Sequence, residues 1–130
     1  MTSSNVPWPA EDELRERLAA IEVAVENFPG TESFEHLLRD LRALLGSVQL
    51  ARSASVPILA EWIATEPWPF GAEEALEFSM RQLQWPEMRA ALEDMQQNAS
   101  IRIRQNVARV LEVYEPTWPG GEIYRTYRDA

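Results

Sequence analysis

Residues 72–114 read AEEALEFSMRQLQWPEMRAALEDMQQNASIRIRQNVARVLEVY, and this stretch decides the fold of the chain. It contains three amphipathic segments in quick succession, of which residues 98–114 have the clearest pattern. Apolar residues recur there at spacings of three and four, which places them on one face of an α-helix. These residues are Ile103, Val107, Val110, Leu111 and Tyr114. The pattern predicts three consecutive helices, and Asn98 or Ser100 is expected to cap the last one.

Two amphipathic segments precede this stretch, with the same alternation of three and four residues. The first stripe consists of Leu14, Leu18, Ile21, Val25 and Phe28. The second consists of Phe34, Leu37, Leu41, Leu44 and Val48, widened by Leu38 and Leu45. Pro29 and Gly30 end the first helix and Thr31 is a suitable cap for the second, so we expect an antiparallel helical hairpin. The matched heptads also suit an intermolecular coiled coil, which makes a homodimer possible.

The connecting segments complete an all-α, single-domain helical bundle of about six helices. Residues 51–56 are small and polar and indicate a linker, after which Pro57 opens a short helix. Residues 66–71 contain two prolines and a glycine, which predict a turn. We therefore divide the domain, residues 1–130, into a flexible lead (1–8), a helical hairpin (9–52), a short-helix array (56–116) and a tail (117–130). The tail either folds back on the body or forms a loose end.

Four of the five tryptophans precede a proline, namely Trp8, Trp68, Trp85 and Trp118. Proline favours an extended backbone in the residue before it, so each pair marks an element boundary. The first three rings are expected to pack across the start of the next helix as hydrophobic staples. The alternative is a shared aromatic pocket for a ligand. Its lining would be Trp62, Trp68, Phe70 and Trp85.

The run IRQNVARVL at residues 103–111 resembles the second helix of a HEAT-like repeat. That helix often begins with Val-Arg, continues through two variable residues to small and apolar positions, and ends in Leu. Asn98 stands near the position where such repeats often carry an Asp before the helix. With the preceding helix from Pro86, the resemblance covers about residues 86–114, a HEAT-like C-terminal helix pair. It implies a protein-binding surface and no chemistry of its own.

The charge of the chain restricts the class of partner. Its 130 residues hold 21 acidic and 12 basic residues, giving a net charge of −9 and a pI near 4.6. This negative field opposes nucleic-acid binding, which relies on neutralising phosphates, and favours a partner protein with a basic surface. There is no apolar run near the length of about 20 residues that a membrane helix needs, so we expect no membrane span. A polar N-terminus without signal-peptide features and the absence of cysteine suit a cytoplasmic protein.

Residues for catalysis are few. His36 is the single histidine, and there is no cysteine for it to activate or to share a zinc ion with. The carboxylate pairs Glu22/Glu26 and Glu73/Glu77 lack the Glu-x-x-His motifs of carboxylate-bridged metal bundles. Glu73 and Glu74 suit the positive end of a helix dipole. We therefore predict no enzyme activity, no catalytic residue, no metal and no cofactor.

These features predict a non-catalytic, acidic protein–protein interaction module. Its most concrete form is an immunity or antitoxin-like inhibitor that covers the basic active site of a toxic partner. The expected contact residues are Glu22, Glu26, Glu73, Glu74, Glu77, Glu93 and Asp94. One alternative is a structural or scaffold subunit that oligomerises or docks on a larger assembly. The other is a small-ligand sensor that uses the aromatic pocket.

Overall fold

The computed structural model describes residues 9–28 and 30–128, so the predictions for residues 1–8, including the Trp8 staple, lie outside it. The described chain consists of helices and their connections and contains no β-strand, which confirms the all-α class. The α-helices are α1 (Pro9–Asn27), α2 (Glu35–Leu45), α3 (Arg52–Trp62), α4 (Ala72–Leu83), α5 (Pro86–Asn98), α6 (Ile101–Leu111) and α7 (Arg125–Arg128). Short 3₁₀ turns occupy Thr31–Ser33, Glu112–Tyr114 and Pro119–Ile123. No described helix has both the length and the apolar character needed to cross a membrane.

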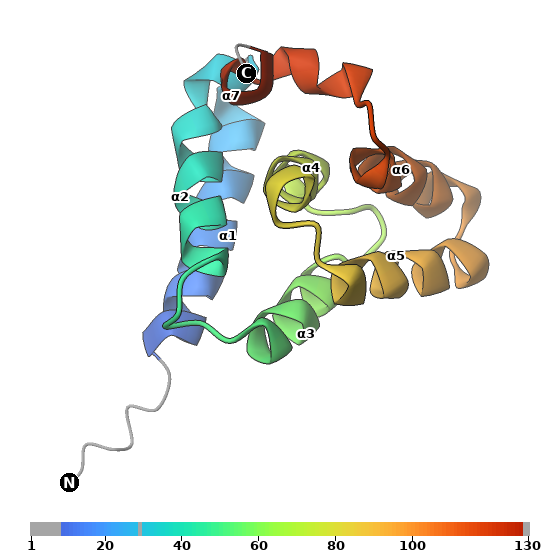
Figure 1. Cartoon of the computed structure of the whole chain (residues 1–130), viewed down its shortest axis with the longest axis horizontal. Helices are drawn as coiled ribbons and strands as arrows, with labels where there is room; N and C mark the ends of the chain where they lie inside the picture. Colours follow the sequence, from blue (N-terminus) through green and yellow to red (C-terminus); the bar gives the residue numbers. More distant parts are fainter. Residues whose placement is uncertain (1–8, 29, 129–130) are drawn as a thin grey trace, which may run out of the picture.

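Helix α4 lies at the centre of the molecule. In Figure 1 it is seen almost end-on, with α1 and α2 on one side and α6 on the other, and it packs against all three. A helix enclosed on several sides must be buried over most of its circumference. Its buried residues are Ala72, Ala75, Leu76, Glu77, Phe78, Ser79 and Met80. The rest of the chain is therefore arranged around this helix.

The predicted α1–α2 hairpin is present, and the two helices pack along their apolar stripes. Leu14 and Ile21 on α1 and Leu38 and Leu41 on α2 are buried in one core. Two members of the predicted stripes are exposed, Phe28 at 55% and Val48 at 102%. The reason is that α1 ends at Asn27 and α2 at Leu45, so the helical spacing that would bury these residues no longer applies. Thr31 lies in a 3₁₀ turn and does not cap α2, which begins at Glu35.

The prediction of a linker at residues 51–56 was wrong. Helix α3 begins at Arg52 and contains Pro57, so the short-helix array starts at residue 52 instead of 56. An internal proline removes one helical hydrogen bond and costs about 3 kcal/mol. Burial of Ile58, Leu59 and Ile63 in the core offsets this cost, because each fully buried side chain contributes about 1.5–3 kcal/mol.

The predicted boundaries between α4, α5 and α6 are confirmed. Trp85 is buried and precedes Pro86, which occupies the first turn of α5. Of the two candidate caps for α6, Ser100 is the one present: its Oγ accepts a hydrogen bond from the Ile103 amide at 3.4 Å. Asn98 instead ends α5. Helices α5 and α6 pack against each other.

The tail folds back on the body. Tyr124 is completely buried, and its ring stacks with Trp118 and meets Phe78 of α4 edge to face. The Arg81 guanidinium donates hydrogen bonds to the carbonyl oxygens of residues 113, 115 and 116, which fixes the chain leading into the tail. Figure 1 shows α7 beside the start of α2. The C-terminal segment is therefore part of the core.

Candidate functional site

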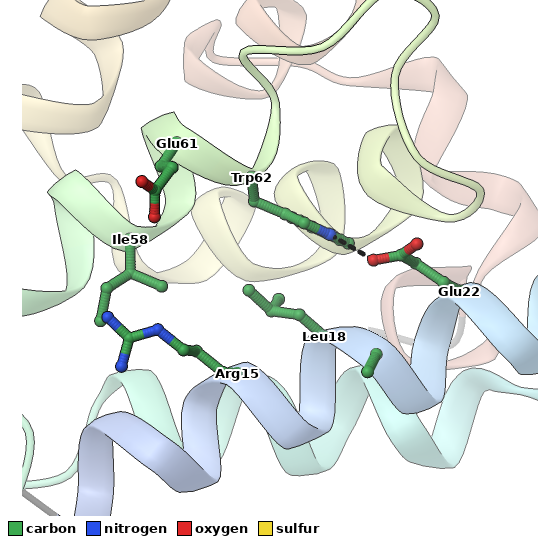
Figure 2. Close-up of a pocket in the computed structure, with 7 residues that line it drawn as sticks. Arg15, Leu18, Glu22, Ile58, Glu61 and Trp62 are labelled. Atoms are coloured by element: carbon green, nitrogen blue, oxygen red, sulfur yellow. Dashed lines mark hydrogen bonds between the residues drawn. The ribbon is translucent and has the colours of Figure 1, made fainter.

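A groove lies between α1 and α3, and we call it the α1–α3 groove (Figure 2). Its volume is about 150 Å³. Its lining residues are Arg15, Leu18, Ala19, Glu22, Ile58, Glu61 and Trp62. The sequence predicted Glu22 as a partner contact and Trp62 as a residue of an aromatic pocket. The groove therefore contains one residue from each of these two predicted sets.

The polar groups of the groove lie around an apolar centre. Figure 2 shows the Trp62 ring above Leu18, with its nitrogen directed at the Glu22 carboxylate. Trp62 Nε1 donates a hydrogen bond of 2.7 Å to Glu22 Oε2. This bond holds the indole in one orientation across the groove, because a short bond to an ionised acceptor is stronger than a neutral one. The Glu61 and Arg15 side chains extend near Ile58 at the other end of the groove.

A second hollow lies where α1, the 66–71 turn and the starts of α4 and α6 meet, and we call it the α4 hollow. Its volume is about 360 Å³. Its lining residues are Val25, Pro67, Trp68, Pro69, Phe70, Gly71, Glu73, Glu74, Arg102 and Asn106. The α1–α3 groove and the α4 hollow are neighbours on α1, since Glu22 lines the first and Val25, less than one turn later, lines the second.

Gly71 allows the close approach of the turn to α1 on which the α4 hollow depends. Its φ of +82° is favourable for glycine and costly for other residues. A Cβ at this position would lie 2.6 Å from Ile21 Cγ2 and 2.8 Å from Val25 Cγ2. The absence of a side chain at residue 71 is therefore what lets the aromatic turn and the first turn of α4 sit against α1.

Three glutamates on α4 differ in exposure and in protonation. Glu73 is held by an ion pair of 3.2 Å with Arg109 Nε and by a hydrogen bond of 2.9 Å from Asn106 Nδ2. Burial, together with the charge of Glu73, raises the pKa of Glu74 above its ordinary value. Burial first and the Glu73 carboxylate second raise the pKa of Glu77 to about 8. Glu77 is thus mainly protonated at neutral pH.

Glu77 is not available as a partner contact, contrary to prediction. Its side chain is only 6% exposed, and its Oε1 accepts a hydrogen bond of 3.0 Å from the Tyr124 hydroxyl. The i, i+4 spacing correctly predicted that Glu77 lies on the same face of α4 as Glu73. Tyr124 of the tail covers this face at Glu77 and buries it. An i, i+4 spacing defines a face and does not say which distant segment covers it.

The other predicted contact residues lie at the surface in two separate regions. Glu26 is exposed on α1, one turn beyond Glu22. Glu93 and Asp94 are exposed on α5, where Glu93 forms an ion pair of 3.2 Å with Arg89. The structure therefore brings Glu22, Glu73 and Glu74 to the α1–α3 groove and the α4 hollow, and leaves Glu26 and the two α5 acids outside both linings.

The prediction of one pocket lined by four aromatic residues was wrong. Trp62 lines the α1–α3 groove, and Trp68 and Phe70 line the α4 hollow. Trp85 lines a third hollow of about 540 Å³ between the end of α2 and the end of α4. The Arg52 guanidinium of α3 lies over the Trp85 ring at 5.1 Å from its centroid, and Trp62, Trp68 and Phe70 are not in the lining of this third hollow.

Exposed apolar residues occur on the elements that form the α4 hollow. Phe70 lines it and is 58% exposed. Phe28 follows Val25 by nearly one turn, and Ile101, which is 67% exposed, precedes the lining residue Arg102. Exposed large apolar residues cost nothing when scattered singly, but several on neighbouring elements are typical of contact surfaces.

Several lining residues were missed by sequence reasoning. Glu61 is a single charge in a helical segment, Arg15 belongs to the charged run at residues 11–17, and Arg102 and Asn106 lie on the polar side of the α6 stripe. Their positions opposite the apolar stripes indicate only that they are exposed. Nothing in the local pattern shows which exposed residues from different helices share a hollow.

The single histidine of the sequence lies outside the linings of the α1–α3 groove and the α4 hollow. His36 is exposed and lines a small hollow with Glu32, Glu35, Arg39 and Arg125, without a hydroxyl nucleophile in that lining. The described residues also contain no group of three or more histidine, aspartate or glutamate side chains with the geometry of a metal site. The two hollows that combine carboxylates with aromatic rings are thus the features that suggest binding.

Comparison with known proteins found no matching family model, no matching curated protein and no matching solved structure. The resemblance of residues 86–114 to a HEAT-like repeat therefore stays a prediction.

Proposed function

We propose that this protein is a non-catalytic binding module that holds a basic partner protein against one acidic and aromatic face. This binding face consists of the α1–α3 groove and the α4 hollow. The observation that carries the proposal is the meeting of Glu22 with Trp62 in the groove and of Glu73 with Trp68 and Phe70 in the hollow. Aromatic residues supply most of the apolar energy of such contacts, and carboxylates provide steering and specificity for a cationic surface.

The net charge of −9 supports the same proposal, because the whole chain attracts a basic partner over several ångströms at moderate salt. In its most concrete form the module is an immunity or antitoxin-like inhibitor. A rigid acidic body of this size would cover the basic active site of a toxic enzyme by mimicking the charge of its substrate. Inhibition by occlusion requires only residues that contact the partner. The carboxylates and aromatic rings of the two hollows are residues of this kind.

Capture of partners from cells that naturally make the protein, with chemical cross-linking and mass spectrometry, tests this proposal. We expect a partner with a basic surface, cross-links to α1 and to residues 62–71, and an affinity that falls steeply with salt. Charge reversal at Glu22 and Glu26 together should weaken binding at least about tenfold, as loss of interface charges commonly does. The same reversal at exposed Glu16 and Glu112 is the matched control. A neutral partner, or equal losses in both double variants, would contradict the proposal.

A scaffold subunit is the second candidate, and a different observation favours it. Val48 is 102% exposed and lines the third hollow with Leu45, Leu50 and Trp85. An apolar side chain that protrudes beside a partly apolar hollow suits self-association or docking on an assembly. Light scattering of the wild type and of Val48→Ser distinguishes the candidates, because a scaffold of this kind should form an oligomer that the substitution dissociates.

A further inference from the structure

The α1–α3 groove lies at the C-terminal end of α3, and this end carries no counter-charge of its own. Glu61 and Trp62 belong to the last turn of the helix, which contains no basic residue, and Ile58 lies just before that turn. The carbonyl groups of a last turn bear a partial negative charge of about half an electron, which favours a nearby cation. The backbone on this side of the groove therefore attracts positive charge independently of any side chain.

The side chains add to this negative potential. Glu61 is exposed, and its carboxylate has no ion pair or side-chain hydrogen bond within the described part of the chain. Glu22 is engaged by Trp62 through one of its two oxygens, so the other oxygen retains its capacity as an acceptor. Arg15 is the basic residue of the lining, and it already forms an ion pair of 3.8 Å with Asp12. The lining thus contains two carboxylates, Glu22 and Glu61, and one cation, Arg15, which is paired with Asp12.

The centre of the groove is apolar, which excludes a small hydrated cation as the best occupant. Leu18, Ala19 and Ile58 form the apolar surface, and the Trp62 indole covers part of it. The groove therefore suits an occupant that has an apolar stem and a flat cationic end. The stem would contact the aliphatic side chains, and the cation would stack on the indole. A guanidinium suits this arrangement better than an ammonium because it is planar, weakly hydrated and able to bind carboxylates through two N–H groups.

We propose that the α1–α3 groove is the subsite that receives an arginine side chain of the partner, an inference that rests on the proposed function. The Trp62 indole, oriented by Glu22, stacks on the guanidinium. Glu61 and the end of α3 balance its charge. The groove thereby specifies one residue of the partner, while the α4 hollow contributes wider contact area.

Nuclear magnetic resonance of the intact protein tests this subsite without a known partner. The probes are Nα-acetyl-arginine N-methylamide and the citrulline analogue, which has nearly the same shape without the charge. We expect the arginine compound at low salt to shift the Trp62 Nε1–H signal in a saturable manner, together with the amides of Ile58 and Glu61. The citrulline compound should bind at least about fivefold more weakly, since hydrogen bonds to charged groups are the stronger class.

Two charge-matched variants locate the effect. Glu61→Gln should lower the affinity for the arginine compound about twofold to fivefold, the range expected for an exposed charge pair. Glu16→Gln removes the same charge from an exposed position on α1 outside the groove lining and should leave the affinity unchanged. Equal weakening by both variants, equal binding of both compounds, or no shift of the Trp62 signal would overturn the arginine subsite.

The outcome separates this inference from the proposed function. If a basic partner is found and its affinity is insensitive to Glu61→Gln, the binding module stands and the arginine subsite fails. If the arginine compound binds in the groove and the cross-linked partner is not basic, the subsite stands and the proposed function fails.

Discussion

The Tyr124 hydroxyl donates a hydrogen bond of 3.0 Å to Glu77 Oε1, joining the C-terminal segment to the central helix across 47 residues of sequence. Both side chains are buried. Next to them, the Glu35 carboxylate accepts hydrogen bonds from the amides of Arg125 and Thr126 at 2.8 and 2.9 Å. These two carboxyl groups hold the tail on α4 and α2. Their pKa values are shifted in opposite directions, so they predict opposite dependences of stability on pH.

Glu77 should make the protein less stable as the pH rises. Its pKa is 4.5 in the ordinary state and about 8 in the fold, so between these values the unfolded chain loses a proton that the folded chain retains. The contribution of Glu77 to stability is fully present below pH 4.5 and is lost as the pH rises toward 8, by about 1.4 kcal/mol per pH unit. Urea unfolding across this range should show the slope in the wild type.

Glu77→Gln should flatten the slope, because a neutral amide has no proton to release. Glu26→Gln, at an exposed position, is the control and should retain the slope of the wild type. An unchanged slope in Glu77→Gln would show that another group titrates in this range.

Tyr124→Phe should destabilise the protein by about 1–3 kcal/mol, because it leaves a buried carboxyl oxygen without its donor. The ring and its contacts with Phe78 and Trp118 are retained in this variant. Chemical denaturation measures the change. In a double-mutant cycle with Glu77→Ala, which removes the acceptor, the two effects should be non-additive, since the residues share one hydrogen bond. Simple additivity would mean that the bond does not contribute to stability.

Glu35→Gln should loosen the C-terminal segment at neutral pH. Burial alone would raise the pKa of Glu35, but hydrogen bonds from the side chain and amide of Thr126 and from the amide of Arg125, with Arg39 nearby, lower it below 4.5. A lowered pKa gives stability that is present above the ordinary value and lost as the pH falls through the folded value. Hydrogen exchange should show lower protection factors, relative to the intrinsic exchange rate at the same pH, for the Arg125 and Thr126 amides in the variant, and in the wild type at acidic pH.

Glu16→Gln is the matched control for this substitution, since Glu16 is an exposed acid on α1 with no ion pair to the described C-terminal segment, whereas Glu32 pairs with Arg128 of α7 at 3.7 Å. It should leave the exchange rates of the Arg125 and Thr126 amides close to those of the wild type. Equal protection of these amides in Glu35→Gln would be contrary to the capping role of the carboxylate.

Gly71→Ala should destabilise the fold by about 2–5 kcal/mol. A left-handed backbone costs a non-glycine residue about 1–2 kcal/mol, and overpacking against Ile21 and Val25 adds about 1–3 kcal/mol. Gly46→Ala is the control, because Gly46 has a φ of −86° and a Cβ there would make ordinary contacts at 3.5 Å. Thermal unfolding of both variants should show a large loss for residue 71 and little change for residue 46.

The helices themselves could be predicted because their signals are local. The spacing of Ile103, Val107 and Val110 predicted the buried face of α6, and all three are buried. The failures occurred where distant contacts outweigh local preference. Pro57 lies inside α3 because the following residues are buried against the core, and the heptad spacing that includes Val48 continues past the end of α2.

The candidate site was predicted only in its residue types. The sequence singled out acids and aromatic rings, and the structure combines Glu22 with Trp62 and Glu73 with Trp68. It separates Trp85 from the other rings and encloses Glu77 under Tyr124. These pairings could not be read from spacing, because each joins residues from different helices.

The sequence by itself determined the helical class, the apolar face of each principal helix and the two candidate caps of α6, Asn98 and Ser100, since these depend on residues within one or two turns of each other. The tertiary structure alone decided that α4 is the central helix, that the tail closes over Glu77, and that two hollows share α1. The physical reason is that burial and protonation depend on which distant segment covers a side chain, and a local pattern does not contain that information.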